Sequence, residues 1–102
     1  MSAPRLLPLD RPNIPPLSIS ARLRGQLVYF MTPPGTAGLP ALREDEFWFA
    51  RDEVSRWLDE GVIRLVSPLD SANATEVELS DEQEALLAWL QKNQVQHVRV
   101  EG

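Results

Sequence analysis

The sequence predicts an α+β fold, a two-layer sandwich in which two helices cover one face of a mixed sheet of four or five strands. Two amphipathic segments support this, because each has a Trp-Leu pair followed, three residues after the leucine, by Gly61 or Asn93 and then by a valine-rich run. Gly and Asn tolerate the left-handed backbone that closes a helix, so each copy indicates a helix, a stop and a strand. This shared stop chemistry explains the match more simply than an internal duplication does.

The first 16 residues hold five of the nine prolines. Proline has no N–H and restrains the residue before it to extended geometry. We therefore expect residues 1–16 to be an extended or disordered arm and residues 17–102 to form a single globular domain. The arm could dock an aromatic groove as a polyproline helix, or it could lie over the domain.

An alternation of apolar with polar residues runs from Leu17 to Met31. A period of two predicts a half-buried strand, with Gly25 at a bend, a bulge or the turn of a pair. The alternation breaks at Val28 and Phe30, where both faces become apolar. We expect this end of the strand to be covered by a helix or by a second subunit.

A loop over residues 32–40 leads to the triplet Phe47-Trp48-Phe49. The triplet is either a short strand or the first turn of a helix entered at Asp45, and we favour the strand. As part of a strand, Trp48 would be out of phase with its two neighbours and near the surface. Helical spacing predicts a helix over residues 51–60, and the run over 62–66 has the composition of a strand buried on both faces.

The last third predicts a strand over 75–79, a helix over 81–92 and a strand over 94–100. Ser80 and Gln83 have the spacing of a capping box, in which each side chain bonds the backbone of the other residue. A strand, a helix and a second strand in this order form a candidate βαβ unit with parallel strands.

Composition limits the possible functions. The chain has no cysteine and a net charge of −5, with about +4 on residues 1–43 and about −9 on residues 44–102. An acidic body with one lysine does not suit nucleic acid, and no long apolar run suits a membrane, so we expect neither partner and take the cytoplasm as the compartment. We also expect no catalytic, metal or cofactor site, because His97 is the single histidine and the acids at 44–46 lack a calcium-loop spacing.

The leading hypothesis is a non-enzymatic protein-interaction domain that forms a homodimer. The proposed contact residues are Arg22, Arg24, Val28, Phe30, Phe47 and Trp48. One alternative is an enzyme or small-ligand binder with a pocket between loop 32–40 and the first helix, lined by Glu44, Asp45 and Glu46, with His97 from another strand. Another is an acidic surface that sequesters a basic partner through Glu76, Glu78, Asp81, Glu82 and Glu84.

Overall fold

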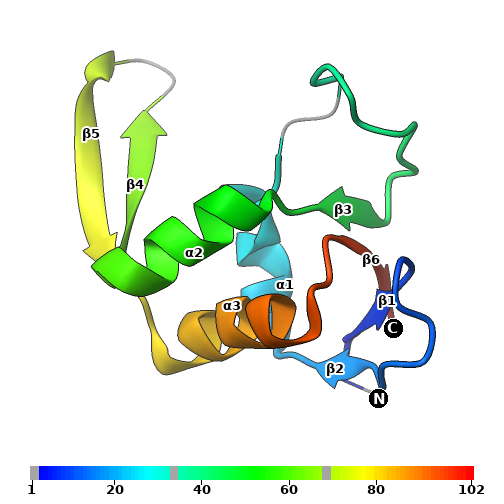
Figure 1. Cartoon of the computed structure of the whole chain (residues 1–102). Helices are drawn as coiled ribbons and strands as arrows, with labels where there is room; N and C mark the ends of the chain where they lie inside the picture. Colours follow the sequence, from blue (N-terminus) through cyan, green and yellow to red (C-terminus); the bar gives the residue numbers. More distant parts are fainter. Residues whose placement is uncertain (1–2, 33–34, 68–69) are drawn as a thin grey trace.

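The computed structural model describes residues 3–32, 35–67 and 70–102, with their side chains except over 64–74. Within these residues the fold contains both helices and antiparallel sheets, which confirms the α+β class (Figure 1). The elements in chain order are β1 (Arg5–Pro8), β2 (Leu17–Ser18), α1 (Ala21–Gln26), the 3₁₀ helix η1 (Leu27–Tyr29), β3 (Glu46–Trp48), α2 (Arg51–Glu60), β4 (Val62–Ser67), β5 (Asp70–Glu78), α3 (Asp81–Asn93) and β6 (His97–Glu101).

The strands form two separate sheets, and every described pairing is antiparallel. One sheet has the order β2-β1-β6-β3, and the other is the hairpin β4-β5. The predicted mixed sheet and the parallel βαβ unit are therefore wrong. β5 begins already at Asp70, soon after β4 ends, and strands with so short a connection pair antiparallel with each other. β5 is then unavailable to β6, although a helix lies between them.

The proline-rich segment supplies β1, which lies between β2 and β6. Leu6 is completely buried, and Pro8 ends the strand opposite Val98. Prolines suit the ends of a strand, where a missing N–H removes little of the ladder. Arg5 forms an ion pair of 3.4 Å with Glu101, so a charge of the basic segment meets an acid of the body.

The predicted strand over Leu17–Met31 is wrong beyond Ser18, because residues 21–29 are helical. The Ser20 hydroxyl caps α1 by accepting the backbone N–H of Leu23, at 3.0 Å. A period of two includes every fourth residue, so the apolar positions of the supposed strand also fit one face of a helix. Ile19, Leu23 and Leu27 are buried at that spacing, and Phe30, three residues later, is buried as well.

The other helices follow the predicted stops and caps closely. Gly61 closes α2 with a φ of 71°, and Ser80 and Gln83 form the capping box of α3. The left-handed residue after α3 is Gln94, with a φ of 54°, rather than the neighbouring Asn93. The short strand at Glu46–Trp48 also confirms the favoured interpretation of the aromatic triplet.

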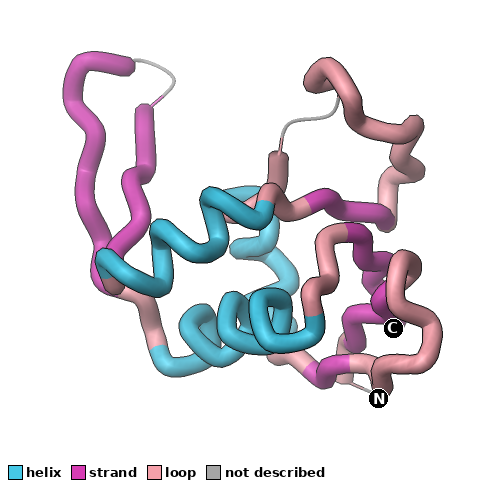
Figure 2. The backbone as a smooth tube through the Cα atoms, in the orientation of Figure 1, coloured by secondary structure: helices cyan, strands magenta, loops and turns pink. Residues whose placement is uncertain are grey.

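A single cluster of buried apolar side chains joins the four-stranded sheet to the helices and to the base of the hairpin. Leu6, Val98 and Val100 come from one face of the sheet, and the cluster is completed by Ile19, Leu23, Leu27, Phe30, Phe49, Val54, Ile63, Leu86, Leu87, Leu90 and Val95. Figure 2 shows the long loop that leads into β3 on one side of the molecule and the hairpin on the other.

Candidate interaction surface

The hairpin β4–β5 projects from the body and stands apart from the four-stranded sheet (Figure 1). β4 and β5 pair with each other from Val62/Glu78 to Val66/Ala74, followed by a register shift between Val66 and Ser67. Within the part of the chain that the structure describes, neither strand pairs with a third. Each outer edge of the hairpin thus presents backbone N–H and C=O groups without a strand partner.

The base of the hairpin is fixed to the core. Ile63 is 3% exposed and belongs to the core cluster, and Leu79 packs against that cluster just after β5. The N–H of Leu79 donates to the carbonyl of Gly61 at 3.0 Å, which extends the ladder toward α2. The hairpin therefore has a fixed root and a projecting end.

The edges of the four-stranded sheet offer much less to a partner. β2 has two residues and β3 has three. The backbone N–H of Thr32 donates to the Trp48 carbonyl at 2.7 Å, so part of the outer edge of β3 is already occupied. Short or covered edges resist pairing with another chain, so the open edges are those of the hairpin.

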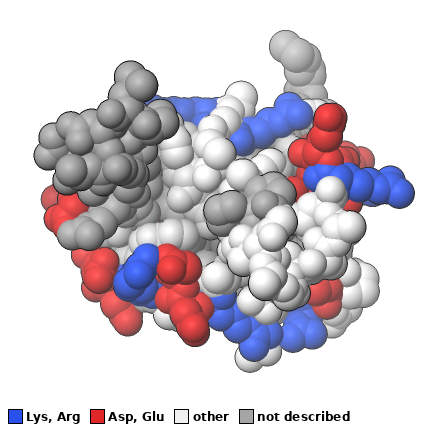
Figure 3. Space-filling view, turned by 90° about the horizontal axis from the view of Figure 1, so that it is seen from above, with Lys and Arg blue, Asp and Glu red and all other residues white. Residues whose placement is uncertain are grey.

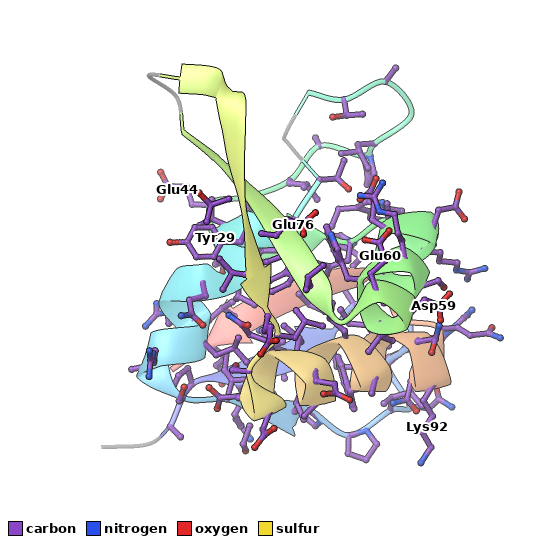
Figure 4. All side chains as sticks on the ribbon, turned by 90° about the vertical axis from the view of Figure 1, so that its left-hand side faces the viewer. Tyr29, Glu44, Asp59, Glu60, Glu76 and Lys92 are labelled. Carbon is purple, nitrogen blue, oxygen red and sulfur yellow. The ribbon has the colours of Figure 1, made fainter. Side chains whose placement is uncertain are left out.

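Apart from Leu9, the large exposed apolar side chains among the described residues lie on η1 and on the hairpin. Val28 is 53% exposed, Tyr29 is 48% exposed, and Val77 of β5 is 38% exposed. In Figure 4, Tyr29 lies to one side of the hairpin and Glu60 of α2 to the other. Figure 3 shows uncharged surface across the middle of the face seen from above, with charged residues toward its margins.

A groove separates α1 from the hairpin and from the start of α3. It is bordered by Arg22, Gln26, Val77, Glu78, Ser80, Asp81, Glu82 and Gln83. Two of these residues are joined by a hydrogen bond of 3.0 Å from the Gln83 side-chain amide to the Gln26 side-chain oxygen. Ser20 also donates to Glu82 from both its backbone N–H and its hydroxyl, which ties the start of α1 to the start of α3.

The predicted contact residues do not form one patch. Val28 is exposed, but Phe30 is 1% exposed and its ring packs edge-on against Trp57, with centroids 5.4 Å apart. The expected cover over both residues at this end is therefore present only at Phe30. Phe47 is half-buried and packs against the core.

The two arginines among the predicted contacts point to different places. Arg22 borders the groove beside the hairpin. Arg24 donates to the backbone carbonyl of Gly102 at 3.2 Å. Of this pair, only Arg22 lies next to the hairpin.

Trp48 lies opposite His97 in the register of β3 and β6. Their rings are 5.9 Å apart and tilted by 49°. His97 Nε2 lies 2.8 Å from Glu46 Oε1, and the two side chains are 19% and 12% exposed. Trp48 is half-buried.

Of the four polar residues in the enzyme alternative, the structure brings Glu46 and His97 into contact. Glu44 and Asp45, the other acids of that alternative, border a shallow depression with Arg24, Phe47 and Val100 instead. The four polar groups do not converge on one cavity. The Glu46–His97 pair accordingly links β3 to β6, as a structural contact would.

Sequence reasoning missed the hairpin edges, because residues 67–74 have the composition of a loop. The available signal was the apolar run at 62–66 followed soon afterwards by a second alternating segment, which is the pattern of a hairpin. No described helix has the length and apolar character needed to cross a membrane, and the described His, Asp and Glu side chains form no group of three that could hold a metal. Comparisons with protein families, with curated proteins and with solved structures give no match.

Proposed function

We propose that this protein is a non-enzymatic interaction domain that forms a homodimer, with the β4–β5 hairpin as its contact element. The observation that carries the proposal is the projecting hairpin, neither edge of which pairs with a third strand among the described residues. Unpaired strand edges are templates for pairing with another chain, and strand addition is a common mode of protein recognition.

The surroundings of the hairpin support this role. Val77 exposes apolar surface at a groove with polar borders, and Val28 and Tyr29 expose more on η1, which directly follows α1. Aromatic side chains are enriched at protein interfaces, and exposed apolar surface with a polar rim is typical of a docking site. Of the predicted contact residues, Arg22 and Val28 have accessible positions, and Tyr29 and Val77 are further candidates.

The acidic-surface alternative is less well supported, because some of its carboxylates already have partners inside the molecule. Glu82 accepts two hydrogen bonds from Ser20. Asp81 and Glu84 lie in the first turn of α3, where acids favour the positive end of the helix dipole. These contacts therefore favour the apolar and backbone groups of the hairpin, rather than the acidic residues, as the surface that a protein partner contacts.

Sedimentation velocity of the full chain from low to high micromolar concentration tests the proposal. We expect the apparent mass to rise from that of one chain, 11.5 kDa, toward that of two. Leu65→Lys should weaken the dimer by about tenfold, because it would place a charge in the aliphatic strand β4 of the contact hairpin. Leu9→Lys is the matched control, since it makes the same change at an exposed leucine that lies just after β1. A monomer at every concentration overturns the homodimer, and equal effects of the two lysines overturn the hairpin as its contact element.

A further inference from the structure

Building on the homodimer proposed above, we propose that two copies pair antiparallel through β4, in a register centred on Leu65, to form the sheet β5-β4-β4-β5 across a twofold axis. The two edges of the hairpin differ in chemistry, and this difference selects β4. The sequence of β4, VIRLVS, has four aliphatic residues and one charge. The sequence of β5, DSANATEVE, has three acids.

Charge disfavours pairing through β5. Two β5 edges placed side by side would bring Asp70, Glu76 and Glu78 of one copy near those of the other, and like charges across a sheet are destabilising. Two β4 edges bring together aliphatic residues instead. A β-hairpin alone is marginally stable in water, and a sheet of three or more strands is more stable. Pairing through β4 would place both hairpins in one sheet of four strands.

The backbone pattern fixes which groups of β4 face the partner. The Leu79 N–H donates to the Gly61 carbonyl, so this pair bonds across the hairpin. Bonded and non-bonded pairs alternate along an antiparallel ladder, so the pairs at Ile63 and Leu65 also bond to β5. The backbone N–H and C=O groups of Val62, Arg64 and Val66 then point outward, to the free edge.

Symmetry restricts the register further. A twofold axis normal to the sheet leaves every side chain on the same face in both copies. Directly opposed residues of antiparallel strands also share a face, so a residue can lie opposite only itself or a residue an even number of positions away. One residue at the centre of the ladder must therefore lie opposite its own copy. Centring on Arg64 would oppose two arginines, which is unfavourable. Centring on Leu65 places Arg64 opposite Val66 of the other copy and keeps residues 63–67, all within β4, in the ladder. It also sets the two bodies further apart.

Disulfide cross-linking tests the register. The chain has no cysteine, so an introduced cysteine is the only thiol that can form a cross-link. Leu65 lies opposite its own copy as a non-hydrogen-bonded pair, with an expected Cα separation of about 4.5 Å that suits a disulfide. We expect Leu65→Cys to cross-link at least about tenfold faster than Thr75→Cys at the same concentration under mild oxidation. Thr75 is the matched control, since it lies opposite Leu65 on β5.

Each other outcome has a definite meaning. Faster cross-linking of Thr75→Cys overturns the choice of β4, and faster cross-linking of Arg64→Cys overturns the register. Equally slow cross-linking of all three, with a dimer in sedimentation, overturns this inference and leaves the proposed function standing. If Leu65→Cys does not fold, amide hydrogen exchange of the unsubstituted chain decides. The Arg64 and Val66 amides should then exchange at least about tenfold more slowly in the dimer than in the monomer, and unchanged rates overturn the inference.

Discussion

Val28 and Phe30 show how differently two neighbouring apolar residues can be used. Both belong to the segment that the sequence predicts to be a doubly covered strand. The helical turn separates them, so that Phe30 contacts Trp57 in the core while Val28 is more than half exposed. Their substitutions should therefore have very different effects.

We expect Phe30→Ala to lower the free energy of unfolding by about 3–5 kcal/mol, since it removes a fully buried ring and leaves a cavity. Val28→Ala should change it by less than about 0.5 kcal/mol, as surface substitutions usually do. Urea titration of both variants measures the difference. Similar losses for the two would mean that Val28 is buried as well, as the strand interpretation requires.

At the scale of the element, the helix starts of α2 and α3 differ in one respect. Ser80 caps α3 through a reciprocal bond with Gln83, whereas Ala50 begins α2 without a side-chain cap. Both residues have the extended backbone that a cap requires. A cap can therefore be removed at Ser80 and added at Ala50, and the two substitutions should have opposite effects on stability.

Ser80→Ala should destabilise the fold by about 1 kcal/mol, because it leaves an N–H of the first turn without its acceptor. Ala50→Ser should stabilise it by up to about 1 kcal/mol, because it adds the missing acceptor. Thermal or urea unfolding of the two variants checks both signs. A shift in the same direction for both would contradict the assigned caps.

The elements also show what the sequence could and could not predict. α2, α3 and β3 follow from local signals: a helical stripe, a capping box and a left-handed Gly61. The segment after Ser18 was misassigned because a period of two and one face of a helix share every fourth position. The predicted strand pairing was wrong for a different reason. β4 pairs with β5 because few residues connect them, but the composition of residues 67–74 indicates a longer loop. Among the predicted contact residues the structure shows Val28 exposed and Phe30 buried, and contact of any of them with a partner stays a prediction.

At the scale of the whole molecule, charge separates the proposed dimer from the acidic-surface alternative. Each chain carries a net charge of −5, so two copies repel each other at long range. Added salt screens this repulsion, and we expect the homodimer to tighten modestly between low and physiological ionic strength. Sedimentation at the two salt concentrations measures the change. Association with a basic partner would weaken with salt instead.

The pairing of β1 with β6 also has a consequence for how the chain folds. These strands form the middle of the four-stranded sheet, and their register joins Arg5 to Glu101 across nearly the whole described sequence. Contacts between distant residues close slowly, because a long loop must first lose its freedom. A chain emerging from the ribosome can form α2 and the β4–β5 hairpin early, but its sheet must wait for residue 101. Until then the helices and the base of the hairpin lack the sheet residues that complete their core, so we expect the core to close only after β6 has left the ribosome.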